Sequence, residues 1–177
     1  MEKENPPQQL EADGKKLYVE GSYQQAAEAF EAAAEAYARA ENPLQAAEMA
    51  NNRCVSLLQL NQGQQALEAV RGTDQVFAEA GDIKKQAIAL ANLGTALEEV
   101  GEKEQALDHF QRSAELFSQI GEDELQVQVT RSASALQLKD RKPLGALASM
   151  RRGLGELEKP SLVQRWLKKL LDIPYNL

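Results

Sequence analysis

The chain has 177 residues, of which 43% are hydrophobic and only 5% aromatic, and its formal net charge is −7. These values suit one compact domain or one short solenoid, with an all-α core built from Ala, Leu and Val. An acidic surface repels nucleic acid, no apolar run is long enough to cross a membrane, and a single cysteine, Cys54, excludes a disulfide framework.

The chain opens with a predicted flexible tail, residues 1–7, which is polar and lacks the apolar stretch of a secretory signal. Residues 8–41 then hold two helical patterns separated by Gly21 and followed by Asn42-Pro43. A glycine commonly ends a helix, and a proline suits the first turn of the next one. The first unit is therefore predicted to be an antiparallel helical hairpin.

The second unit, residues 42–81, has a similar punctuation at Gly63 and Gly81. Gly72 falls inside its second helical pattern, so we interpret it as a residue that allows close packing. This unit is also predicted to be a hairpin of two helices.

The third unit, residues 82–121, has the clearest signals. Asp82 is a predicted N-cap, and Gly101 and Gly121 follow the two helical patterns as C′ glycines. This unit, too, is predicted to be a helical hairpin.

The fourth unit is predicted over residues 122–158 and lacks such clear turn residues. Residues 160–171 follow it with an apolar stripe, which favours a helix that caps the stack over an amphipathic helix that binds a membrane or a partner. Residues 172–177 form an apolar tail that we expect to be extended. This tail must fold back or enter the groove of a neighbouring chain.

A period of 40 residues connects the four units without an insertion. One column is made of alanines, a second of small residues, a third of large apolar residues and a fourth mainly of aromatic residues. These columns are Ala26, Ala66, Ala106 and Ala146; Gly14, Cys54, Gly94 and Ser134; Phe30, Val70, Phe110 and Met150; and Tyr37, Phe77, Phe117 and Leu157. Stacked copies of such a unit bury one continuous core.

The third unit resembles a tetratricopeptide (TPR) motif through Leu90, Leu93, Gly94, Leu97, Gly101, Ala106 and Phe110. The second unit departs from the motif because Asn61 stands where a glycine is expected. The period of 40 is similar to that of the long-helix variants in kinesin light chains and Pins-type scaffolds. The resemblance implies a right-handed superhelical stack of four TPR-like hairpins plus the capping helix, and a protein or peptide as the ligand.

The resemblance also places the first helix of each hairpin on a concave face. We call the following positions the predicted groove residues: Lys15, Tyr18, Asn51, Asn52, Val55, Gln59, Ile88, Asn92, Thr95, Glu99 and Arg131. Glu11 and Val19 belong to the same face in the first unit. Asn52 and Asn92, one period apart, either hold the backbone of an extended peptide or are solvent-facing polar residues.

A carboxylate clamp of the kind found in heat-shock co-chaperones is disfavoured, because among its positions only Asn52 agrees. Cys54 is interpreted as a small buried residue, and His109, the one histidine, as a surface residue that binds no metal. With no catalytic constellation or cofactor motif, we expect a non-enzymatic, cytoplasmic scaffold that binds a protein partner in its concave groove. The alternative is a self-assembling module, a homodimer in which the C-terminal tail docks into a neighbouring chain.

Overall fold

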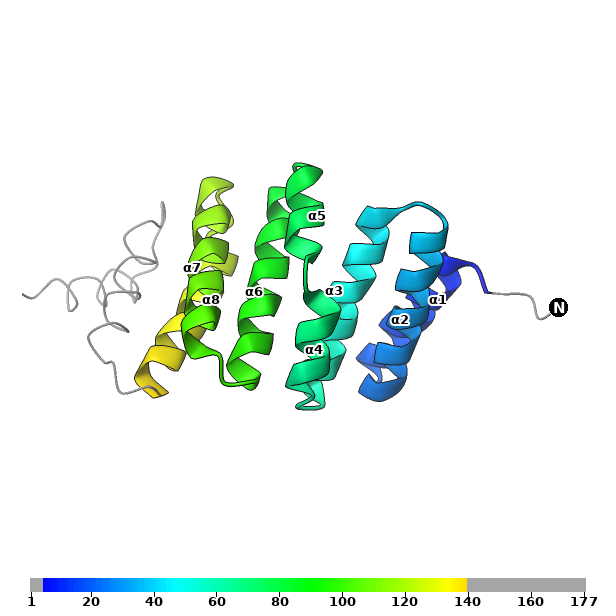
Figure 1. Ribbon diagram of the computed structural model, residues 1–177, viewed down its shortest axis with the longest axis horizontal. Coiled ribbons are helices and arrows are strands. Elements are labelled where there is room, and N and C mark those ends of the chain that lie inside the picture. Colours follow the sequence, from blue (N-terminus) through cyan, green and yellow to red (C-terminus); the bar gives the residue numbers. More distant parts are fainter. Residues whose placement is uncertain (1–4, 140–177) are drawn as a thin grey trace, which may run out of the picture.

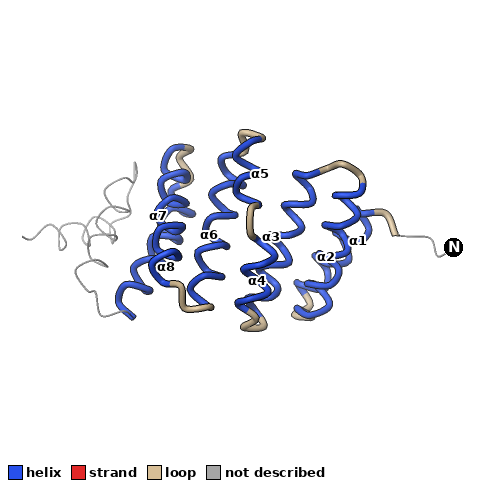
Figure 2. Tube along the Cα trace, viewed as in Figure 1, coloured by secondary structure: helices blue, strands red, loops and turns tan. Residues whose placement is uncertain are grey.

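The structure is a computed structural model that describes residues 5–139, and every regular element in this range is an α-helix (Figures 1 and 2). The all-α prediction is therefore confirmed for this part of the chain. The helices are α1 (Pro7–Val19), α2 (Tyr23–Arg39), α3 (Pro43–Gln59), α4 (Gly63–Val70), α5 (Thr73–Glu79), α6 (Ile83–Glu99), α7 (Lys103–Gln119) and α8 (Asp123–Lys139).

The helices follow one another along the longest axis, with α1 and α2 at one end, α7 and α8 at the other, and α5 above α4 in between (Figure 1). Most pack mainly against their neighbours in the chain, whereas α4 and α5 both pack against α3 and α6, and α3 also contacts α6. Sequential packing of this kind is expected of a helical repeat stack. The second helix of the fourth unit, the capping helix 160–171 and the tail 172–177 lie outside the described residues, so these elements and the handedness of the superhelix remain predictions.

Most of the described helices are followed within two residues by a residue in the left-handed backbone conformation. Gly101 has a φ of 86°, and Gly21, Gly81 and Gly121 have φ values between 71° and 77°. At the turn of the second unit, Asn61 takes over this role with a φ of 56°, which an asparagine tolerates better than most residues. Gly63 is not the turn residue predicted from sequence. It is the first residue of α4, where a Cβ would lie only 2.7 Å from the Cβ of Glu99.

Two helix starts have the caps that their sequences indicate. The side chain of Asn42 accepts a hydrogen bond from the backbone N–H of Gln45, and that of Asp82 accepts one from Lys85 at 2.9 Å. Each cap satisfies a backbone donor that the first turn of a helix leaves unpaired. The N-cap predicted at Asp82 is therefore confirmed.

The second helix of the second unit is broken, which the sequence analysis did not predict. Gly72 has a φ of 80°, and a Cβ at this position would meet no atom within 4 Å, so Gly72 is a chain break and not a close-packing residue. Arg71 is extended, with a ψ of 126°, and the Thr73 hydroxyl donates to the carbonyl of Val70 at 2.8 Å. The result is two short helices, α4 and α5, in place of one.

The columns of small and large residues explain how the hairpins close. A Cβ at Gly14 would lie 2.8 Å from the Cδ1 atom of Phe30, and one at Gly94 would lie 2.8 Å from the Cδ1 atom of Phe110. In the second unit, the larger Cys54 is matched with the smaller Val70, and both are buried in the same cluster. Each of the first three hairpins thus combines a small residue with a large one, or two of intermediate size, and so keeps its packing dense.

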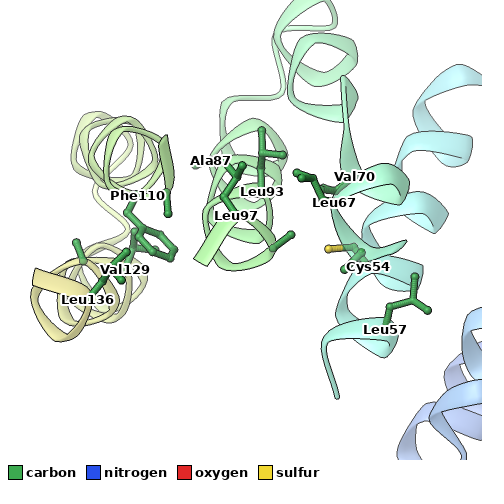
Figure 3. Packing of buried hydrophobic residues seen from close by; sticks show 14 of the residues in the cluster. Cys54, Leu57, Leu67, Val70, Ala87, Leu93, Leu97, Phe110, Val129 and Leu136 are labelled. Atoms are coloured by element: carbon green, nitrogen blue, oxygen red, sulfur yellow. The ribbon is translucent and has the colours of Figure 1, made fainter. Parts of the chain in front are cut away.

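The largest core cluster includes Ala27 of α2 and runs through α3, α4, α6, α7 and α8 (Figure 3). In the figure, Leu93 and Leu97 of α6 lie between the side chains of the second unit and those around Phe110. Cys54 is fully buried, and burial raises the pKa of its thiol to about 12. Cys54 is therefore the small, inert core residue predicted from its column.

Candidate functional site

The predicted groove residues lie on α1, α3, α6 and α8, the first helices of the four units. On α6, Ile88, Asn92, Thr95 and Glu99 recur at intervals of three and four residues and so share one face. Ile88 is 37% exposed and so adds an apolar group to this face. We call the junction between α1 and α3 seam one, and the junction between α3 and α6 seam two.

Seam one contains a pocket of about 230 Å³. It is lined by Lys15, Tyr18 and Val19 of α1, Phe30 of α2, and Asn52 and Val55 of α3. Four of these six are predicted groove residues, and the structure brings them together at one pocket. Phe30 was predicted only as a core residue. Its column of large apolar residues does not indicate that its side chain also lines a pocket between α1 and α3.

The apolar wall of the pocket is unusually accessible. Val19, in the last turn of α1, is 86% exposed, whereas the other large apolar residues of the described chain are at most 56% exposed. The ring of Tyr18 packs edge-on against that of Tyr23, with the centroids 5.4 Å apart, which holds Tyr18 in place. An open pocket with a fixed aromatic wall suits the apolar side chain of a ligand.

The two asparagines that the sequence analysis singled out have different surroundings. In seam two, the Asn92 amide donates from Nδ2 to Oδ1 of Asn51 at 3.0 Å, and Asn51 in turn donates to the carbonyl of Ala47. Asn51 is only 6% exposed, so it lies beneath the surface. In seam one, the side chain of Asn52 is half-buried at the pocket and makes no hydrogen bond within residues 5–139.

Glu11 occupies in seam one the place that Asn51 occupies in seam two, one period earlier. Its Oε1 atom accepts a hydrogen bond from Lys15 at 2.5 Å, and its Oε2 atom accepts one from the hydroxyl of Tyr37 at 2.6 Å. These two bonds, that of Lys15 first, hold the pKa of Glu11 below its ordinary value. The same bond to Glu11, and then burial, raises the pKa of Tyr37 to about 12.

The remaining predicted groove residues lie away from the pocket. Gln59, Glu99 and Arg131 are exposed on the last turn of α3, the last turn of α6 and the middle of α8. The hydroxyl of Thr95 donates back to the carbonyl of Ala91 at 3.0 Å and so is used within its own helix. The predicted set therefore divides into a group around the pocket and single residues spread over the other helices.

A comparison with protein families finds a match to the model described as "Soluble NSF attachment protein, SNAP", over residues 3–151. This match covers most of the chain. The chain belongs to the SNAP family. No curated protein shows a significant match to it. The family consists of TPR-like helical repeat proteins that mediate protein–protein interactions, so the resemblance identified the kind of repeat but not the family itself.

Proteins of the SNAP family are adaptors and not catalysts, and the described residues contain no group of His, Cys, Asp or Glu side chains that could hold a metal ion. His109 is half-buried on α7, and not on the surface as predicted. Its Nδ1 atom is buried without a hydrogen-bond partner in the described part of the chain, and burial, followed by the nearby Arg112, lowers its pKa. None of the helices within residues 5–139 is long and apolar enough to cross a membrane.

Proposed function

We propose that this SNAP-family chain is a binding scaffold that receives a peptide or a helix of a partner protein along α1, α3 and α6. The observation that carries the proposal is the open pocket of seam one, where the Asn52 amide, which makes no hydrogen bond within residues 5–139, lies beside the exposed Val19 and the half-buried Val55. A half-buried amide without a partner in the described chain is a group that a ligand can satisfy.

The pocket suggests how a partner is held. An apolar side chain of the partner enters between Val19 and Val55, over the ring of Phe30. The Asn52 amide then donates to a carbonyl and accepts from an N–H of the partner's backbone. Since Lys15 is already paired with Glu11, the pocket selects for an apolar group more than for a carboxylate.

The other predicted groove residues extend the proposed contact along the stack. Ile88 supplies a second exposed apolar side chain on α6, and Gln59, Glu99 and Arg131 add polar contacts at its margins. Asn51 and Asn92 support this surface through their mutual hydrogen bond. The central apolar pocket should contribute more to affinity than these exposed polar contacts, which exchange with water.

The first defined partner to test follows from the family description, which refers to attachment to NSF. Immobilised full-length chain is incubated with purified NSF, and in parallel with an extract whose captured proteins are identified by mass spectrometry. We expect capture of a protein by the unaltered chain and a loss of about tenfold or more with Val19→Asp or Asn52→Ala, as for residues at the centre of an interface.

The matched control is Gln111→Ala on α7, an exposed residue whose side chain, within the described part of the chain, donates a hydrogen bond only to Glu115 one turn away. Circular dichroism verifies that all variants keep their helices. Equal capture by the control and by both pocket variants would show that the partner binds elsewhere and would refute the proposal.

A further inference from the structure

The aromatic column of the repeat contains one hydroxyl. Tyr37 stands in the first unit where Phe77 and Phe117 stand in the second and third, and all three side chains are buried. A buried tyrosine hydroxyl normally needs a hydrogen-bond partner. Tyr37 finds one in Oε2 of Glu11, 2.6 Å away on α1.

The same period relates the residues of the two seams. Glu11 corresponds to Asn51, and Asn52 corresponds to Asn92. In seam two, where the aromatic residue is Phe77, the side-chain oxygen of Asn51 is free to accept from Asn92 and does so at 3.0 Å. In seam one, both oxygens of Glu11 are already engaged, one by Lys15 and the other by Tyr37.

We propose that the Tyr37 hydroxyl is a positioning group that keeps Glu11 bonded away from Asn52 and so leaves the Asn52 amide available to a ligand. Without this hydroxyl, Oε2 of Glu11 accepts a hydrogen bond from Nδ2 of Asn52, and seam one closes as seam two does. The inference rests on the proposed function, because the amide it concerns is the one proposed to hold the partner.

The negative charge of Glu11 would make a hydrogen bond from the Asn52 amide to its carboxylate strong. A hydrogen bond from an amide to a carboxylate is about twice as strong as one between neutral groups. An Asn52 amide captured by Glu11 would therefore exchange poorly for the neutral carbonyl of a peptide. Each carboxylate oxygen can accept two hydrogen bonds, so the hydroxyl of Tyr37 acts by orientation: its bond to Oε2 keeps the carboxylate of Glu11 turned toward α2 and away from Asn52.

The test is Tyr37→Phe, which installs the residue that the second and third units carry at this position. Solvent exchange of the Asn52 side-chain amide protons is followed by ¹⁵N NMR on the full chain, with no partner added. We expect exchange of one proton to slow by about tenfold, as for an amide that gains a charged acceptor. A crystal structure of the variant should then place Nδ2 of Asn52 within hydrogen-bond distance of Oε2 of Glu11.

Two further variants complete the experiment. Tyr23→Phe removes a hydroxyl that makes no hydrogen bond within residues 5–139, and should leave the exchange of Asn52 unchanged. The double variant Tyr37→Phe with Glu11→Ala removes the competing acceptor and should restore the fast exchange of the unaltered chain.

Unchanged exchange in a folded Tyr37→Phe chain overturns the positioning role, and so does slowed exchange that persists when Glu11 is also removed. The outcome is independent of the partner-capture experiment, because the NMR measurement uses the chain alone. If Asn52→Ala captures the partner normally while Tyr37→Phe slows exchange, the proposed function fails and the effect of Tyr37 on Asn52 stands.

Discussion

Seam one and seam two are built from the same repeat, one period apart, yet they differ in what their side chains offer. Seam two is closed by the hydrogen bond between Asn51 and Asn92 and by an ion pair between Glu48 and Lys85. In seam one, no hydrogen bond or ion pair joins α1 to α3 within the described residues, and a pocket of about 230 Å³ remains. Side chains at equivalent positions of the repeat therefore distinguish a junction that is joined by polar contacts from one that contains an open pocket.

The largest expected effect comes from breaking seam two. Asn51→Ala removes the acceptor of Asn92 and the donor to Ala47 at a buried position. Leaving such groups unsatisfied costs about 1–3 kcal/mol, which urea denaturation followed by circular dichroism will measure. Asn52→Ala, the neighbouring change in the open seam, should alter the free energy of unfolding by less than about 0.5 kcal/mol. If Asn51→Ala and Asn52→Ala lowered the free energy of unfolding equally, the proposed difference between the two seams would be wrong.

A smaller effect is expected from Tyr37→Phe at neutral pH. The variant loses the hydrogen bond to Glu11 but keeps the packing of the ring, and Glu11 keeps its bond to Lys15. The free energy of unfolding should fall by about 1.5 kcal/mol, the lower end of the usual net value of a hydrogen bond to a charged group. Tyr23→Phe is the control and should change stability less. A Tyr37→Phe chain as stable as the original would show that the bond to Glu11 adds nothing to folding.

The stability contributed by Tyr37 should also depend on pH. Its pKa is about 12 in the folded chain against an ordinary value of 10.0, so the folded state holds the phenol proton more tightly than the unfolded state does. The contribution is therefore fully present below pH 10 and is lost as the pH rises through 12. Urea titrations at pH 9 and above pH 11 should show the advantage over Tyr37→Phe shrinking. An advantage that stays constant over this range would contradict the raised pKa.

The smallest effect is expected at the ion pair of seam two. Lys85 Nζ lies 2.8 Å from Oε2 of Glu48, but both side chains are about one-third exposed. Exposed pairs of this kind contribute about 0–1 kcal/mol and weaken with salt. Lys85→Met should therefore cost little at low salt and almost nothing at 1 M NaCl. A large, salt-independent loss would assign the closure of seam two to Lys85 and not to Asn51.

The sequence was sufficient to predict the helical hairpins of the first three units and the buried Cys54, because these depend on local preferences and on residue size repeated at a fixed interval. It also placed Lys15, Tyr18, Asn52 and Val55 on one face, because a helix fixes that relation by its periodicity. These four residues line the pocket that the structure contains.

The rest depended on contacts between helices, which a period does not specify. Asn51 and Asn52 are adjacent in sequence, and only the packing of α3 against α6 decides that the first is buried and the second is not. The bond between Tyr37 and Glu11 joins residues 26 positions apart and required the side-chain conformations. Gly72 was misinterpreted because glycine inside a helical pattern is compatible with either close packing or a break.

The break at Gly72 also has a mechanical consequence. An uninterrupted helix resists bending, because every turn is braced by hydrogen bonds along its axis, whereas α4 and α5 meet at an extended residue and a left-handed glycine. A force applied to the two ends of the described stack should therefore deform the second unit before the first or the third. Single-molecule pulling between residues 10 and 120 should register a softer response than in a chain where Gly72 and its neighbours are replaced by helix-forming residues.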